Sequence, residues 1–164
     1  MPDPARLAAP YAGYRTEVRA ELIDYNGHLN DAGYAIVLSE ANEALLAHLG
    51  LSEAYRADTG RAMYTVESHI RYLAEAMRGD VIEAASLLVS ADAKRLRVHT
   101  VLRRDDGVPV ATGEYLYLHV DQAAGGVAAM PPDRWAAVNA LLSAHASLER
   151  PGHIGRGIGN SQQR

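Results

Sequence analysis

Cysteine is absent from this chain of 164 residues, which excludes disulfides, thiolate metal sites and a cysteine nucleophile. A basic excess is absent as well: 16 Lys and Arg face 20 Asp and Glu, for a net charge of −4. That balance argues against binding to nucleic acid or to an anionic membrane. No segment approaches the roughly 18 consecutive apolar residues that span a bilayer. The first residues, MPDPARLAAPYAGY, also lack the basic and apolar segments of a signal peptide, so we expect a cytoplasmic protein.

Phenylalanine is missing too, and the aromatic rings belong to nine Tyr and one Trp. Each ring therefore carries a polar group, which suits a half-wet pocket or an interface. Aromatic drift in a GC-rich genome explains the bias equally well. The chain does have 48% hydrophobic residues, enough for one buried core at this length. We predict a single domain over residues 1–164, with its core at about 11–122.

The hydrophobic period changes twice along the chain. Residues 14–23, YRTEVRAELI, alternate between polar and apolar and predict a first strand. From Asn30 the apolar residues recur every three or four positions until Gly50, which predicts a helix of about five turns. After a short polar connector, alternating runs predict four long antiparallel strands, at 63–76, 80–91, 94–104 and 108–120.

The predicted strands should form a meander, and in the first of them Tyr64, Val66, Ile70 and Tyr72 should share one face. One long helix laid across such a sheet covers one face economically, which gives an α+β fold. The uncovered face or an edge should then meet a partner subunit, in a homodimer or homotetramer. The chain should end in a second helix at about 131–146 and a mobile Gly-rich tail at 151–164.

The densest polar stretch, DYNGHLND, lies between the first predicted strand and the long helix. Within it, Asp24 could serve as the general base or nucleophile of a hydrolase. The amide N–H groups of Gly27, His28 and the helix start should point outward unsatisfied, where they could stabilise an oxyanion. Gly27 would also let a substrate approach the backbone closely. A simpler alternative is a loop carboxylate that forms an Asx turn.

This order of elements and the pattern D-x-N-x-H-[VL]-N-x-x-x-Y resemble the hotdog-fold thioesterases, in which a curled antiparallel sheet wraps a long helix. The matching positions are Asp24, Asn26, His28, Leu29, Asn30 and Tyr34. The motif is similar to that of plant acyl-ACP thioesterases and of part of the 4-hydroxybenzoyl-CoA thioesterase-like superfamily. The resemblance implies an acyl-CoA thioesterase with Asp24, Asn26 and His28 as catalytic residues. It implies no cofactor, because CoA enters as part of the substrate.

A narrower resemblance, over about residues 11–160, is to the thioesterase domain fused to, or found beside, bacterial carnitine dehydrogenases. It is carried by YRTEVRAELIDYNGH, YTVESHIRYLAEA, DAKRLRVH and LHVD. It implies betainyl-CoA as the substrate, although Leu22 and Leu29 stand where the subgroup often has Trp and Met, which could admit another small acyl group. A trimethylammonium group would sit against aromatic faces. The available tyrosines are Tyr25, Tyr34, Tyr64, Tyr72, Tyr115 and Tyr117.

The resemblance also implies a second catalytic carboxylate further along the chain, and Glu75 in YLAEA matches that position. Glu67 is the reserve candidate, and either one could be no more than a solvated charge on a strand. In the implied site, His28 hydrogen-bonds the thioester carbonyl or orients Asp24, and Asn26 holds the water or the histidine. We expect Asn30 to be only the helix cap.

Substrate contacts are expected from the loop, the helix and one basic strand. Gly27, Tyr25 and Tyr34 should lie near the acyl group, although Tyr34 also begins the apolar stripe of the helix. In KRLRVHTVLRR, Arg95 and Arg97 could bind the phosphates of CoA or form only a solvated face. No metal site is expected, because the histidines lack ligand spacing. Two alternatives remain open: a hotdog protein that binds acyl thioesters without hydrolysis, and an enoyl-thioester hydratase or dehydratase.

Overall fold

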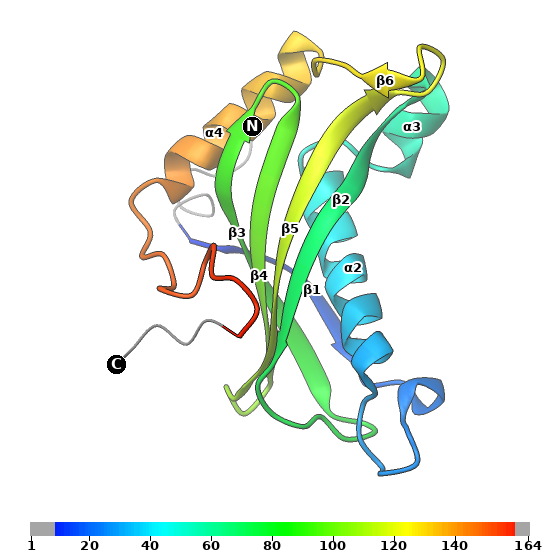
Figure 1. Ribbon diagram of the computed structural model, residues 1–164, viewed down its shortest axis with the longest axis vertical. Helices are drawn as coiled ribbons and strands as arrows, with labels where there is room; N and C mark the ends of the chain where they lie inside the picture. Colours follow the sequence, from blue (N-terminus) through cyan, green and yellow to red (C-terminus); the bar gives the residue numbers. More distant parts are fainter. Residues whose placement is uncertain (1–8, 160–164) are drawn as a thin grey trace.

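The computed structural model describes residues 9–159, as a curled antiparallel sheet with a long helix against it (Figure 1). The elements in chain order are β1 (Tyr11–Glu17), the 3-10 helix η1 (Ala20–Leu22), α2 (Asp31–His48), α3 (Glu53–Thr59), β2 (Arg61–Tyr72), β3 (Val81–Asp92), β4 (Arg95–Arg104), β5 (Pro109–Asp121), β6 (Gly126–Val127) and α4 (Pro132–His145). The strand order is β1-β3-β4-β5-β2, with β6 paired to β5. The predicted α+β arrangement is confirmed.

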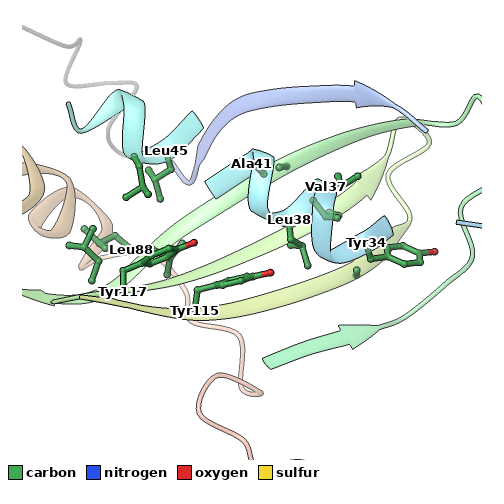
Figure 2. Close-up of a cluster of buried hydrophobic side chains, with 14 of the residues drawn as sticks. Tyr34, Val37, Leu38, Ala41, Leu45, Leu88, Tyr115 and Tyr117 are labelled. Atoms are coloured by element: carbon green, nitrogen blue, oxygen red, sulfur yellow. The ribbon is translucent and has the colours of Figure 1, made fainter. Parts of the chain in front are cut away.

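Helix α2 begins and ends where the sequence predicts. The Asn30 side chain caps its start by accepting a hydrogen bond from the Gly33 N–H, and the chain turns at Gly50 with a φ of 73°. The apolar stripe packs onto the concave face of the sheet (Figure 2). Its core contacts join Tyr34, Val37, Leu38, Ala41 and Leu45 of the helix to Leu88, Tyr115 and Tyr117 of the strands. Each fully buried side chain of this size contributes about 1.5–3 kcal/mol, so this layer dominates the stability.

The strand order departs from the predicted meander. Strands β3, β4 and β5 do follow one another through short hairpins, but β2 pairs with β5 and β1 pairs with β3. The reason is connection length: the two hairpins are too short for anything but neighbouring strands, whereas residues 73–80 can cross from one edge of the curled sheet towards the other. The alternating pattern in each strand carries no information on which strand lies beside it.

Two predicted strand boundaries and one predicted face are wrong. Strand β1 ends at Glu17 rather than running through 14–23, because the chain leaves the sheet and forms η1. Strand β2 stops at Tyr72, before the predicted end at 76. A β-bulge between Thr65 and Glu67 inserts one residue, so Tyr64 and Tyr72 point to opposite faces of the sheet.

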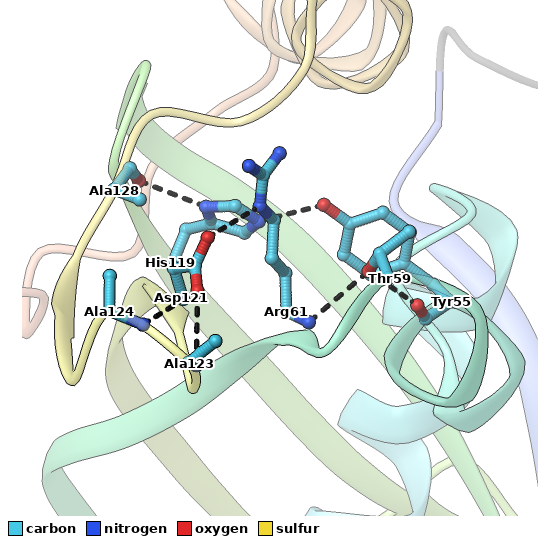
Figure 3. A network of polar contacts seen from close by, with 8 residues as sticks. All are labelled: Tyr55, Thr59, Arg61, His119, Asp121, Ala123, Ala124 and Ala128. Atoms are coloured by element: carbon cyan, nitrogen blue, oxygen red, sulfur yellow. Dashed lines mark hydrogen bonds and ion pairs between the residues drawn. The ribbon is translucent and has the colours of Figure 1, made fainter.

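A buried polar network joins α3 to the far end of the sheet (Figure 3). The Tyr55 hydroxyl lies 2.9 Å from His119 Nε2, and His119 Nδ1 lies 2.9 Å from the Ala128 carbonyl. Since a carbonyl can only accept, Nδ1 carries the proton and Nε2 accepts from the tyrosine. Beside it, Arg61 pairs with Asp121 at 3.0 Å. The network anchors the start of β2 and the end of β5. These lie at the end of the sheet opposite the loop that precedes α2, which is called the motif loop below.

Helix α4, predicted at about 131–146, packs against β3 (Figure 1). A bulge between Leu88 and Ser90 frees the Leu88 N–H, which donates to His145 Nδ1 at 3.0 Å. Within the described residues, each helix is too short or too polar to cross a bilayer.

The segment that follows α4, where a mobile tail is predicted, contacts the sheet in this structure. Residues 151–159 lie against the outer face of the sheet, where Gly155 N–H donates to Glu114 at 2.9 Å. His153 Nε2 also lies 2.9 Å from His99 Nε2 of β4. The mobility of this tail stays a prediction for 151–159, while 160–164 lie outside the described residues.

Candidate active site

The loop between η1 and α2 is fixed by backbone hydrogen bonds on two sides. Asp24 N–H donates to the His28 carbonyl at 2.9 Å, and Leu29 N–H donates to the Ala76 carbonyl at 2.8 Å. Gly27 turns the loop with a φ of 86°, a left-handed conformation that favours glycine. The start of α2 and the segment that follows β2 are therefore held side by side.

The Asp24 carboxylate forms the Asx turn that the sequence left as the simpler alternative. Its Oδ1 accepts a hydrogen bond from Asn26 N–H at 2.8 Å and a longer one from His28 N–H at 3.4 Å. Desolvation by itself raises the pKa of Asp24, but the hydrogen bonds from Asn26 and His28 outweigh it and hold the pKa below its ordinary value of 3.8. The group is therefore ionised at neutral pH, as a general base or nucleophile must be.

Glu75, predicted as the second carboxylate, lies beside His28. The distance from His28 Nε2 to Glu75 Oε2 is 3.3 Å, with a largely buried imidazole and a largely exposed carboxylate. The Glu75 backbone carbonyl accepts a hydrogen bond from Arg104 at 3.0 Å, which ties this segment to β4. The structure thus brings the two residues together from positions 47 apart in the chain, and their catalytic roles stay predictions.

These side chains surround a cavity of about 350 Å³ at the N-terminus of α2. Its lining comes from the loop, the first turn of α2, and the end of β2 with the residues after it. The lining residues are Asp24, His28, Leu29, Asn30, Asp31, Tyr34, Tyr72, Leu73, Ala74 and Glu75. Such a mixture of apolar walls and a few converging polar groups is typical of small-molecule sites. The predicted site residues Asn26, Gly27 and Tyr25 lie on the loop but not in this lining, and Tyr25 is 98% exposed.

The predicted oxyanion donors require correction. Gly27 N–H donates to the Asp24 carbonyl at 3.0 Å, and His28 N–H points at the Asp24 carboxylate, so neither amide is free. Within the described chain, the first amide of α2, Asp31 N–H, carries no hydrogen bond. It stands at the positive end of the helix dipole and borders the cavity. The sequence predicted free amides at Gly27, His28 and the helix start, and of these only the helix-start amide, that of Asp31, is without a hydrogen bond among the described residues.

Three other predicted residues lie away from the cavity. Glu67, the reserve carboxylate, and Arg97 line a different cavity of about 550 Å³, on the outer face of the sheet beneath residues 155–158. Arg97 is engaged there by Glu114, and Arg95 pairs with Asp92 at 2.6 Å. Their role in binding CoA phosphates stays a prediction.

Leu22 and Leu29, which stand where the resembling subgroup often has Trp and Met, pack beneath the loop. Both are buried, at 9% and 4% exposed, and both belong to the hydrophobic core. Leu22 does not line the cavity, whereas Leu29 does. The position where the resembling subgroup often has Trp is therefore a core position in this chain.

Within residues 9–159, no three His, Asp or Glu side chains gather as a metal site requires.

Comparison with known proteins places the chain in a family. The model of the thioesterase-like superfamily matches residues 18–141, and the chain belongs to that superfamily. The chain is 39% identical to the betainyl-CoA thioesterase of Pseudomonas aeruginosa, over 89% of this chain and 92% of that protein. It is 42% identical to the L-carnitine dehydrogenase/betainyl-CoA thioesterase of Agrobacterium fabrum, over 91% of this chain but only 30% of that longer protein.

Solved structures agree with this assignment. A Staphylococcus aureus protein whose structure was determined in complex with CoA superposes with a TM-score of 0.85, at 26% identity, over 93% of this chain and 98% of that one. The predicted hotdog fold is therefore confirmed.

Proposed function

We propose that this chain is an acyl-CoA thioesterase that hydrolyses a short acyl group, with betainyl-CoA as its substrate. The observation that carries the proposal is the convergence of an ionised Asp24, the His28–Glu75 pair and the first turn of α2 on one cavity. The names of the relatives from Pseudomonas and Agrobacterium support betainyl-CoA as the substrate.

The geometry suggests how the residues would divide the reaction. Asp24 removes a proton from a water whose oxygen attacks the thioester carbonyl carbon, or attacks that carbon itself. Asp31 N–H and the helix dipole stabilise the oxyanion that forms. The tetrahedral intermediate then expels the thiolate of CoA. This leaves the free acid when water attacked, and a mixed anhydride with Asp24, which water hydrolyses to the free acid, when the carboxylate attacked. His28, held by Glu75, is placed to donate a hydrogen bond to the carbonyl oxygen or to the leaving sulfur.

The test is hydrolysis of a panel of acyl-CoAs by the purified chain, with release of the CoA thiol followed by a disulfide reagent. Betainyl-CoA should be the preferred substrate, with acetyl-, butyryl- and benzoyl-CoA as comparisons. Hydrolysis of none of them would refute the proposal. CoA binding without turnover would instead favour a non-hydrolytic acyl-thioester protein, an alternative that gains support from the engagement of Asp24 in its own Asx turn.

We further propose that the working unit contains a second copy of the chain, paired along β2. Within the described residues, β2 is the last strand of the sheet and has no partner on its outer side. Tyr64, Val66, Tyr72 and Leu73 are about half exposed, spread over both faces of this edge strand or beside it. Tyr72 and Leu73 also line the catalytic cavity, so a second copy there would narrow its open side. We retain the cytoplasm as the proposed compartment.

A further inference from the structure

One wall of the catalytic cavity is an aromatic corner formed by Tyr34 and Tyr72. The ring centroids are 5.5 Å apart and the planes meet at 68°, so the two rings form adjacent walls. Tyr34 comes from α2 and Tyr72 from the last position of β2, and both line the cavity. Two rings at a steep angle are the minimum of the aromatic cages that hold quaternary ammonium groups.

The two rings differ in how much surface they offer to a ligand. Tyr34 is 5% exposed, and its hydroxyl donates to the Ala74 carbonyl at 2.9 Å, so its position is fixed within the core. Tyr72 is 53% exposed and keeps ring surface free, with its hydroxyl 3.5 Å from the Asp31 carbonyl. Tyr34 therefore supports the ring of Tyr72, and Tyr72 faces the space that a substrate would occupy.

Carboxylates predominate in the lining of the cavity, although Arg104 lies close enough to donate to the Glu75 carbonyl. Asp24, Asp31 and Glu75 line the cavity, whereas its lining contains no Lys or Arg. Desolvation, and then the negative charge of Asp31, raise the pKa of Tyr72. A cationic acyl group would be attracted to this end of the cavity, and an anionic one repelled.

The other tyrosines that the sequence offered are placed elsewhere. Tyr115 and Tyr117 stack on each other beneath α2 and are 6% and 5% exposed. Tyr64 lies on the opposite face of the sheet because of the bulge in β2, and Tyr25 extends from the loop. Among the six candidates, only the Tyr34–Tyr72 pair lines the cavity that holds Asp24.

We infer that Tyr72 determines specificity for a cationic acyl group, by placing its ring against a quaternary ammonium at the end of the cavity, with Tyr34 as the positioning residue. This inference rests on the proposed thioesterase function and deepens it. It concerns the cationic end of the proposed betainyl group, a trimethylammonium joined to the thioester carbonyl through one methylene. Asp24 and Asp31 add the negative field that favours the cation.

The test compares two thioesters that differ only in charge: betainyl-CoA and 3,3-dimethylbutanoyl-CoA, in which carbon replaces the quaternary nitrogen. The wild type should show the higher kcat/KM for the charged substrate. In Tyr72→Leu the ratio of the two kcat/KM values should fall by about 3- to 30-fold, the range expected for the loss of one cation–π contact. Tyr72→Phe keeps the ring and should keep the ratio within about twofold of the wild type.

The matched control is Tyr64→Leu, the same substitution on the same strand but on the opposite face, and it should leave the ratio unchanged. A ratio that stays at the wild-type value in folded Tyr72→Leu would overturn the inference, as would equal hydrolysis of both substrates by the wild type. In both of those cases the thioesterase function would stand. Failure of the wild type to hydrolyse either substrate would overturn the proposed function, and the inference with it.

Discussion

Asp24 combines a structural role in the loop with the proposed role in the chemistry. Its hydrogen bonds with Asn26 and His28 shape the loop, and the same bonds keep the carboxylate ionised. A group with this pKa is a weak base, so its contribution depends on position and on exclusion of water rather than on basicity. In the proposed mechanism, the Asp31 N–H supplies the opposite partial charge that the oxyanion needs.

Replacement of Asp24 by Asn separates these two roles. Asn can still form the Asx turn, so the loop and the stability should be preserved, whereas the base or nucleophile is lost. We expect kcat for betainyl-CoA to fall at least about 10²-fold with an unchanged melting temperature. Full activity would move the chemical role to Glu75, and Glu75→Gln is the variant that would then be decisive.

The lowered pKa of Asp24 also predicts the acid side of the pH–rate profile. A carboxylate whose pKa is depressed stays ionised to lower pH than usual, so the form active in catalysis persists as the pH falls towards 3.8. The decline in kcat/KM that is due to Asp24 should therefore lie below pH 3.8, provided that the chain remains folded. A decline attributable to Asp24 and centred at pH 5 or above would contradict the hydrogen-bonding pattern described for this loop.

At the scale of elements, the start of α2 does two things at once. Its cap holds the first turn in place, and the first turn contains Asp31, which borders the cavity. Stability and activity should therefore respond together to a change at the cap.

Asn30→Ala removes the cap, while Asn30→Asp keeps an equivalent acceptor. We expect the alanine variant to lose about 1 kcal/mol in free energy of unfolding, measured by urea denaturation, and the aspartate variant to stay within a few tenths of the wild type. The alanine variant should also lose kcat, because the amide of the first turn is less well fixed. An alanine variant as stable as the wild type would show that the cap contributes nothing.

The segment 151–159 is attached to β4 and β5 by a contact that depends on protonation. Burial, and then the neighbouring His153, lower the pKa of His99 to about 4, and burial also lowers the pKa of His153. A hydrogen bond between two Nε2 atoms needs one of them deprotonated, and the nearby Arg71 and Arg156 also disfavour added charge. The contact is therefore stable when both rings are neutral.

The sign of the pH effect follows from these lowered values. Because folding depresses the histidine pKa values below 6.5, the unfolded state binds more protons, and the contact loses stability as the pH falls from 6.5 towards 4. Backbone ¹⁵N relaxation of residues 152–159 should show rigid amides at pH 7.5 and mobile ones near pH 5. His153→Gln, which keeps a donor but cannot take a charge, should weaken the dependence of that mobility on pH, because only His99 is then left to titrate at the contact. A segment that stays rigid at pH 4.5 would refute this explanation.

At the scale of the whole molecule, the open edge of β2 and the open side of the catalytic cavity are the same region. Long exposed edge strands are rare in stable monomers, because they pair with other chains. The apolar residues along β2 make a specific pairing of two copies the economical arrangement. Activity should therefore depend on assembly.

Val66→Lys tests this dependence by placing a charge on the exposed edge. We expect sedimentation velocity to show a dimer or larger assembly for the wild type and a monomer for the variant, with reduced kcat/KM. Val127→Lys is the matched control, because Val127 is similarly exposed on β6, away from this edge. A wild type that sediments as a monomer at micromolar concentration would refute the proposed pairing.

The sequence by itself determined the local elements and the residues that carry the chemistry. Helix α2 was predictable because its cap, apolar stripe and terminal glycine act within a few residues of one another. The motif loop was predictable for the same reason, since an Asx turn and a helix start are local structures. Resemblance to the family added Glu75, which no local pattern would have linked to His28.

Only the tertiary structure decided what depends on contacts between distant segments. The pairing of β2 with β5, the bulge that reverses Tyr64, and the attachment of residues 151–159 to the outer face leave no periodic signal, because backbone pairing is nearly independent of side-chain type. The same holds for the amides: whether Gly27 or Asp31 offers a free N–H depends on which carbonyls the folded loop meets. The sequence thus specified the chemical groups of the site, and the fold selected which of them face the substrate.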